Sequence, residues 1–194
     1  MNKENLLKQI ADTAYNVGFG AKKHFATYDI VDKVPGIIAF SSMAVGIFGL
    51  VCEVLSEKLL SAFFLVLGIA GLYIERYNET KEEFMKKGEE LTAIYYDLKV
   101  LYYKVKSSSS DLFEKEQYEL NDISQRYYSN CLSKQILFSD WFAHYKFFWQ
   151  NQIDWVDEQK HFKLWRDKLP LSFTVFIVIL LLTASGYLIC YCIT

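Results

Sequence analysis

The stretch "AFSSMAVGIFGLVCEVLSEKLLSAFFLVLGIAGLYIER", residues 39–76, decides the fold of this chain. It contains most of two apolar runs that are joined by a short charged turn. The runs without a charged residue are Pro35–Cys52 and Leu59–Ile74, which are 18 and 16 residues long. A helix needs roughly 20 apolar residues, with a range of about 17–25, to cross the hydrocarbon core of a bilayer. The stretch therefore predicts a transmembrane hairpin over residues 35–76. For the shorter second run, a buried or re-entrant helix is the alternative interpretation.

Two further segments extend the pattern toward the ends of the chain. Leu169–Thr194 carries no charge over 26 residues and predicts a third transmembrane helix over residues 169–194. Residues 1–34 place an apolar side chain at every third or fourth position, which is the spacing of one helix face. We therefore expect an N-terminal amphipathic helix over residues 1–34. Pro35 is expected at the start of the first span, where a helix tolerates proline best. The apolar positions are Leu6, Ile10, Ala14, Val17, Ala21 and Phe25.

Residues 77–168 form the longest segment outside the apolar runs. Thr80 and Glu83 have the spacing of a capping box, which predicts the start of a helix. This helix is expected to continue to about Lys106. The tetraserine Ser107–Ser110 follows and is typical of a flexible turn.

Two more helices are expected in the same segment. Asp111 with Glu114 predicts the start of one of them, and the other should run from about Ser139 to Pro170. No strand-like alternation occurs between them. The sequence therefore predicts an all-α integral membrane protein, in which residues 77–168 form a helical domain outside the membrane.

The basic residues predict how the chain crosses the membrane. Lysine and arginine precede the first run, follow the second and precede the third. The turn of the hairpin has one lysine, Lys58, beside Glu53 and Glu57, and the end of the chain has no charge after the third run. By the positive-inside rule, the N-terminus and residues 77–168 are cytoplasmic, and the hairpin turn and the C-terminus face outward.

Charge and cysteine usage exclude some classes of function. The formal net charge is −2, with basic and acidic residues mixed, so direct nucleic-acid binding is not expected. The four cysteines contain no CxxC pair, and three of them lie in or beside the apolar runs, so no disulfide framework is expected.

Catalytic and metal-binding patterns are missing from the sequence. His24, His144 and His161 have no metal-like spacing. Asp140 and His144, four residues apart, favour a surface hydrogen bond over a ligand pair. Phosphate-binding, nucleophile-elbow and zinc-protease motifs do not occur. We therefore expect neither an enzyme nor a bound metal or cofactor.

The cytoplasmic segment contains more aromatic side chains than three or four helices are expected to bury. Aromatic residues concentrate binding energy at protein interfaces, so the surplus predicts a surface for self-association or for a partner protein. Packing in the core and a belt at the membrane surface are the alternative interpretation. The residues assigned to the surface are Tyr95, Tyr96, Tyr102, Tyr103, Trp141, Phe148 and Trp149.

Small residues form a stripe along the hairpin. In the first run, Pro35, Ala39, Ser42, Gly46, Gly49 and Glu53 follow one another at steps of three or four, and in the second run Ser61, Gly68 and Gly71 lie near one face. Small side chains let the backbones of membrane helices approach closely. One interpretation packs the two stripes against each other within one hairpin. The other lets copies of the first span meet around an axis, with the small residues lining a pore and Glu53 and Glu57 at its outer mouth.

The order of these parts resembles the SLATT family. The resemblance rests on the segment "YNVGFGAKKHFATYDIV", the tight two-span hairpin and the helix that opens with "YIERYNETKEEFMKKGEELTAIYYDL", and it covers roughly residues 5–165. SLATT proteins are two-span membrane effectors linked to prokaryotic nucleotide-signalling and reverse-transcriptase-containing conflict systems. The resemblance implies a non-enzymatic effector of the bacterial inner membrane that oligomerises and permeabilises it. A nucleotide signal or a neighbouring defence protein would be its trigger.

Two hypotheses of function follow. The first is a membrane-permeabilising defence effector, a pore or channel that works as a homo-oligomer in the lipid bilayer. The alternative is a non-conducting scaffold, anchored in the membrane, whose aromatic cytoplasmic helices recruit a partner protein. The spans have charged residues only at their ends, which argues against proton-coupled transport but not against a passive channel.

Overall fold

The computed structural model describes residues 2–52, 58–110, 112–129 and 134–193, and every regular element in these ranges is helical. The predicted all-α class is therefore confirmed. The elements are α1 (Lys3–Gly49), α2 (Lys58–Glu75), the 3₁₀ turn η2 (Asn78–Thr80), α3 (Lys81–Ser107), α4 (Glu114–Ser129), α5 (Ser139–Gln150), α6 (Asp154–Lys160), the π-helical turn η3 (Leu164–Lys168) and α7 (Leu171–Ile193).

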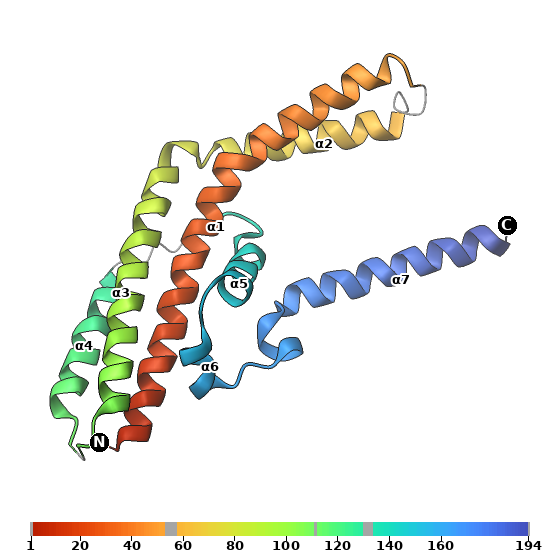
Figure 1. Ribbon diagram of the computed structural model, residues 1–194. Helices are drawn as coiled ribbons and strands as arrows, with labels where there is room; N and C mark the ends of the chain where they lie inside the picture. The colour runs from red at the N-terminus through yellow and green to blue at the C-terminus, as the bar shows by residue number, and fades with distance from the viewer. Residues whose placement is uncertain (1, 53–57, 111, 130–133, 194) are drawn as a thin grey trace.

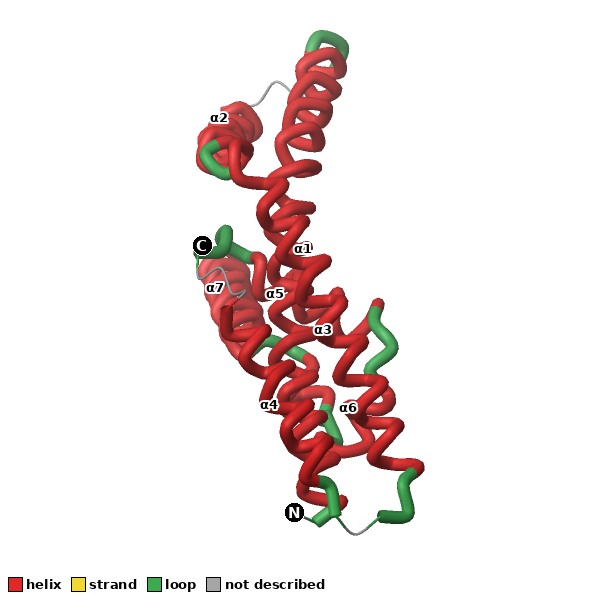
Figure 2. Tube along the Cα trace, turned by 90° about the vertical axis from the view of Figure 1, so that its left-hand side faces the viewer, coloured by secondary structure: helices red, strands yellow, loops and turns green. Residues whose placement is uncertain are grey.

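The molecule consists of a helical bundle and two arms (Figure 1). The first part of α1 packs along α3 and α4 on one side and against α5 and α6 on the other. The second part of α1 leaves the bundle and forms the first arm together with α2, and α7 forms the second arm. Figure 2 shows the hairpin rising above the bundle, on the end opposite the N-terminus.

The first helix crosses the expected boundary at residues 34 and 35 without a break. Pro35 was expected at the start of the span, but it lies inside α1. One proline does not end a helix that is held by packing on one side of it, so the helix continues from the predicted amphipathic segment into the predicted span, and the division between the two at residues 34 and 35 stays a prediction. Proline removes one backbone hydrogen bond and bends a helix. Figure 1 shows α1 changing direction as it passes from the bundle into the hairpin.

The bundle core lies between α1 and α3. The predicted apolar face of α1 is confirmed, because Leu6, Ile10, Ala14, Val17 and Ala21 are all buried. They pack in one cluster with a matching face of α3, and burial of each larger aliphatic side chain contributes about 1.5–3 kcal/mol. The residues of that face are Leu91, Ile94, Leu98, Leu101 and Val105.

The start of α3 differs from the predicted capping box. Thr80 is the N-cap residue, but its side chain makes no capping hydrogen bond. Its hydroxyl donates to the carbonyl of Tyr77 at 3.2 Å instead. The reason is that η2 precedes α3 directly, so Thr80 has a ψ of 3° rather than the extended backbone of a capping residue. Asp111, the second predicted cap, lies outside the described residues.

The predicted third helix, from Ser139 to Pro170, is wrong, since the structure divides it into α5, α6 and η3. Asn151 has extended backbone angles after α5, and His161 has the positive φ of 52° that ends α6. Leu169 is extended because the ring of Pro170 disfavours a helical conformation in the preceding residue. These breaks fold α5 and α6 back onto α1.

Ion pairs hold α1 where it leaves the bundle. The carboxylate of Asp29 pairs with Lys33 one turn later and with Lys146 of α5. Asp32 pairs with Lys81 of α3 at 2.9 Å. Burial alone would raise the pKa of Asp29, but hydrogen bonds from Lys146 and Lys33 outweigh that effect and lower it. The base of the hairpin is therefore tied to two other helices.

A buried polar cluster fixes the segment before α5 to α1. Thr27 donates its hydroxyl hydrogen to Oε1 of Gln135 at 2.6 Å, and the amide nitrogen of Gln135 lies 3.3 Å from Nδ1 of His24. Since Thr27 occupies the amide oxygen, the amide NH₂ group donates to His24, which must be neutral to accept. Burial, and then the positive charges of Lys23 and Lys87, lower the pKa of His24 to about 4.

The low pKa of His24 predicts that acid destabilises the bundle. In the unfolded chain this pKa is 6.5, so between pH 6.5 and 4 the unfolded state binds more protons than the folded state. The free energy of unfolding should therefore fall as the pH falls through this window, by about 3 kcal/mol in total. We expect the melting temperature of the full chain in detergent to drop less between pH 7.5 and 4.5 in His24→Gln than in wild type.

The exposed His161 provides the control for this measurement. His161→Asn keeps a side chain that tolerates positive φ, and it should retain the full acid-induced drop. Equal drops in His24→Gln and wild type would contradict the role of His24.

Candidate functional site

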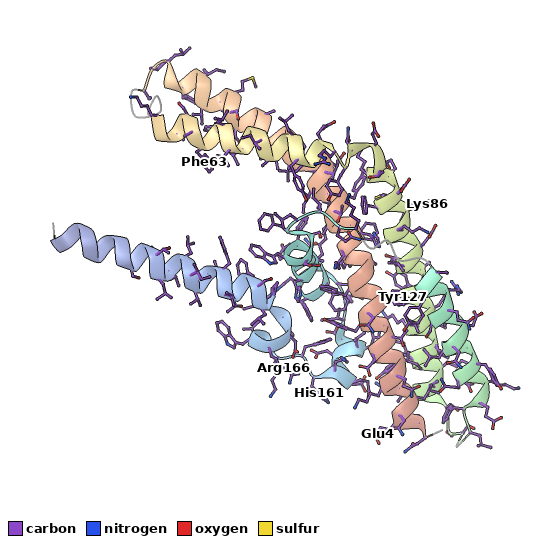
Figure 3. The ribbon with its side chains drawn as sticks, turned by 180° about the vertical axis from the view of Figure 1, so that it is seen from behind. Glu4, Phe63, Lys86, Tyr127, His161 and Arg166 are labelled. Atoms are coloured by element: carbon purple, nitrogen blue, oxygen red, sulfur yellow. The ribbon has the colours of Figure 1, made fainter. Side chains whose placement is uncertain are left out.

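The hairpin formed by the second part of α1 and by α2 exposes an apolar surface along its whole length. Large side chains that face outward on α1 include Ile37, Phe40, Met43, Ile47 and Phe48. On α2 they include Phe63, Leu65, Val66, Ile69 and Leu72 (Figure 3). Soluble monomers rarely expose a contiguous apolar patch of more than a few hundred Å². The surface fits the hydrocarbon core of a bilayer, because there its apolar side chains contact lipid and not water.

Length and composition distinguish the three predicted spans. In the part of the chain that the structure describes, α1 alone is long and apolar enough to be a span by itself, and only 6% of its most apolar window is buried inside the chain. Leu60–Glu75 passes the same test together with the helix that follows it, across a bend of 41°. Residues Leu171–Ser185 of α7 form a shorter apolar helix. These findings agree with a membrane location and leave the number of spans as a prediction.

A groove of about 390 Å³ lies between the two helices of the hairpin, toward its turn. Four of the predicted stripe residues come together there: Ser42, Gly46 and Gly49 from α1 and Ser61 from α2. Val45, Leu50, Leu60 and Phe64 complete the lining. Ala39, Gly68 and Gly71 do not line the groove. Glu53 and Glu57, the predicted outer mouth, lie outside the described residues.

The glycines of the hairpin differ from those of the bundle. A Cβ atom added at Gly18 would lie 2.8 Å from the ring of Tyr95, and one added at Gly88 would lie 2.8 Å from the ring of Phe25. At Gly46, Gly68 and Gly71 the same atom would meet nothing within 4 Å. Close packing therefore explains Gly18 and Gly88 of the bundle, whereas no neighbour among the described residues explains Gly46, Gly68 and Gly71 of the hairpin.

The predicted aromatic surface is only partly exposed. Tyr95, Tyr102 and Phe148 are buried in the bundle, where a ring contacts more apolar atoms than it would at the surface, so these three rings are not part of an exposed surface. The ring of Trp155 lies 5.3 Å from that of Tyr95 and 5.2 Å from that of Tyr102, which places a tryptophan of α6 between two turns of α3. Three of the assigned residues, Tyr96, Tyr103 and Trp149, do face outward.

Trp141 has a different role, because it holds the second arm. Its indole N–H donates to the hydroxyl of Ser172 at 2.9 Å. Its ring lies 5.3 Å from Phe173 and 5.6 Å from Phe176. The base of α7 is therefore attached to α5, and through α5 to α1, so that both arms connect to the same bundle (Figure 1).

His24 and His144 have different neighbours in the fold. His24 contacts Gln135, and the ring of His144 lies 4.8 Å from that of Phe19. The predicted hydrogen bond between Asp140 and His144 is not among those of the described residues, and Asp140 instead pairs with Lys23 at 2.7 Å. Burial lowers the pKa of His144. Within the described ranges, no three His, Cys, Asp or Glu side chains are arranged to hold a metal ion.

Comparison with known families agrees with this arrangement of a bundle and an apolar hairpin. The family described as "SMODS and SLOG-associating 2TM effector domain 6" matches residues 1–177, which include the bundle, the hairpin and the first residues of α7. Most of α7 lies beyond the match. Comparisons with curated proteins and with solved structures give no match. Since 177 of its 194 residues match, the chain belongs to the SLATT family of SMODS and SLOG-associating two-transmembrane effector domains, as its sequence predicted.

Proposed function

We propose that this chain oligomerises through its hairpin and permeabilises the bacterial inner membrane as a defence effector. Membership of the SLATT family implies a membrane effector of conflict systems. The proposal adds that several hairpins meet in the bilayer and open a path for ions. No step of this function requires catalysis, a metal or a cofactor.

The open groove of the hairpin is the observation that carries the proposal. Half of the residues that line it are glycine or serine, and a Cβ added at Gly46 would meet no atom of the described residues within 4 Å. In lipid there is no hydrophobic force between helices, so small residues are used where another backbone approaches closely. A hairpin from a second copy supplies such a backbone. The serine hydroxyls then lie near the contact and offer hydrogen bonds to a partner helix or to water.

The orientation in the membrane is proposed from the charges. The bundle contains most of the lysine and arginine residues of the chain, which favours a cytoplasmic bundle and N-terminus. The hairpin turn and the C-terminus would face outward. In this orientation the bundle is available to a nucleotide signal or to a neighbouring defence protein, which we propose as the trigger.

The experiment is an ion-flux measurement on the full chain in liposomes, together with its mass in detergent. We expect the chain to release a cation that is trapped in the liposomes, as reported by an indicator dye. We also expect a homo-oligomer, because a single hairpin cannot enclose a path for ions. In cells, controlled expression should depolarise the membrane and stop growth. A monomer that produces no flux, in the presence and absence of a cell extract from an infected culture, would contradict the proposal.

The exposed aromatics of the bundle support the second candidate, a scaffold that recruits a partner. Tyr96 and Tyr103 lie seven residues apart on α3 and share an outward face, and Trp149 is exposed on α5. A scaffold would bind a partner protein through these rings and would give neither flux nor growth arrest. Tyr96→Ser with Tyr103→Ser separates the two candidates, because it should abolish partner binding by a scaffold and leave the flux of a pore unchanged.

A further inference from the structure

A pocket of about 500 Å³ lies at the elbow where α2 ends and α3 begins. The end of α2 and the turn after it contribute Tyr73, Arg76 and Tyr77. Thr80 is the last residue of η2, Glu83 and Phe84 come from the start of α3, and Lys134 comes from the segment before α5. The pocket therefore joins the hairpin, the bundle and a segment that is more than 50 residues away in the sequence.

The charges of the elbow pocket favour an anion. Arg76 and Lys134 give two positive charges against the one negative charge of Glu83, a net charge of +1. Eleven other basic residues form ion pairs, whereas among the described residues Arg76 and Lys134 form none. Two unpaired cations beside one cavity fit a group with a single negative charge that accepts several hydrogen bonds.

Lys134 is held at the pocket by its neighbours in the chain. The side chain of Gln135 is bonded to Thr27, and Ile136 is buried against Val31 and Ile74. The ammonium group of Lys134 lies 5.9 Å from the centre of a tyrosine ring of the elbow, Tyr77. The backbone that carries Lys134 is therefore anchored beside the pocket.

The aromatic side of the pocket places it at the surface of the bilayer. The rings of Tyr73 and Tyr77 are 5.8 Å apart, and their hydroxyl oxygens are separated by 3.4 Å. They follow the apolar run of α2 directly. Tyrosine is enriched at this depth of a membrane, where its ring contacts the acyl chains and its hydroxyl reaches the headgroups. The phosphate layer of the cytoplasmic leaflet lies at the same depth.

We propose that the elbow pocket binds the phosphodiester headgroup of an anionic phospholipid. Arg76 and Lys134 contact the phosphate oxygens, and the tyrosine rings line the path of the acyl chains. A phosphodiester carries one negative charge, which balances the net charge of the pocket. The inference rests on a membrane location of the hairpin, but it does not require that the hairpin forms a pore.

The test uses native mass spectrometry on the full-length chain purified in detergent, with dioleoylphosphatidylglycerol as the probe. We expect a retained lipid whose dissociation constant rises about tenfold or more in the double variant Arg76→Gln with Lys134→Gln. The double variant Lys8→Gln with Lys115→Gln is the matched control. It removes the same charge from exposed positions of α1 and α4 outside the pocket, and its affinity should change by less than about twofold.

Two further probes identify the source of the phosphate. Dioleoylphosphatidylcholine has no net charge and should bind about tenfold more weakly than phosphatidylglycerol. Glycerophosphoglycerol has the same headgroup without acyl chains and should show no retained complex. Equal lipid affinity in the two double variants would overturn the site, and equal binding of the free headgroup would overturn its assignment to a lipid. A chain that produces ion flux but fails these tests would leave the proposed function intact.

Discussion

Replacing Gly18 by leucine is expected to destabilise the helical bundle strongly. The first added atom, Cβ, would lie 2.8 Å from Tyr95 and 2.9 Å from Phe147, and a leucine adds three more carbons beyond it. Both rings are buried, so neither can move into solvent. Extra methylenes in a packed core cost about 1–3 kcal/mol, and a whole leucine side chain should reach or exceed the upper value. For a chain of this length, this corresponds to a melting temperature lower by about 6–12 °C.

Gly36→Leu is the control for this prediction. An atom added at Gly36 meets nothing within 4 Å, and the same change of residue at that position should improve helix propensity by up to about 1 kcal/mol. Circular dichroism of both variants in detergent, followed against temperature, measures the difference. If Gly18→Leu melted at the temperature of Gly36→Leu, the close packing of α1 on α3 and α5 would be wrong.

The helical architecture follows from patterns that are visible in the sequence. Apolar residues at helical spacing identify the buried face of α1, and charge-free runs identify the two arms. The breaks after α5 and α6 do not follow in the same way. They depend on His161 adopting a positive φ and on Asn151 becoming extended, and neither residue is a strong helix breaker. These backbone angles arise because tertiary contacts fold α6 back onto α1, and such contacts are not encoded locally.

The adjacent tyrosines of α3, Tyr95–Tyr96 and Tyr102–Tyr103, show how far sequence spacing predicts which side chains are buried. Neighbouring residues on a helix point about 100° apart, so the two members of a pair cannot both face one core. In α3 the first member of each pair is buried, with Tyr95 5% and Tyr102 0% exposed. The second member is outside, with Tyr96 58% and Tyr103 48% exposed. The seven-residue spacing predicts that the first members share a face, and Leu91 and Leu98 on that same face provide the signal that it is the core.

The elbow pocket is harder to predict. The end of the second apolar run carries tyrosine and arginine, which is a recognisable sign of the membrane surface. The second cation, Lys134, lies far along the chain in a segment without regular structure. It reaches the pocket because Gln135 and Ile136 are anchored on α1. Contacts between segments so far apart in the chain cannot be predicted from a local sequence pattern.

Replacing Gly46 by leucine is expected to abolish membrane permeabilisation while the chain remains folded. Gly46 lines the groove of the hairpin, and a Cβ added there meets no atom of the described residues within 4 Å, so a larger side chain has room at this position. A leucine would fill the space that we assign to a helix of a second copy. Loss of close backbone contact between membrane helices should weaken association, and a loss of about 1.4 kcal/mol at each contact lowers association about tenfold. Because the contact repeats around a ring, ion flux from liposomes should fall by more than tenfold.

Gly36→Leu again provides the matched control, since it makes the same chemical change in open space on the same helix but outside the groove. We expect its mass in detergent and its ion flux to equal those of wild type within error, and its melting temperature to equal that of wild type or to exceed it by up to about 4 °C. Gly46→Leu should share the melting temperature of this control and differ from it in mass and flux. If the Gly46→Leu chain assembled and conducted like Gly36→Leu, the groove would not be the contact between copies. The small residues would then let the two helices of one hairpin pack closely, and the result would favour the scaffold hypothesis over the pore.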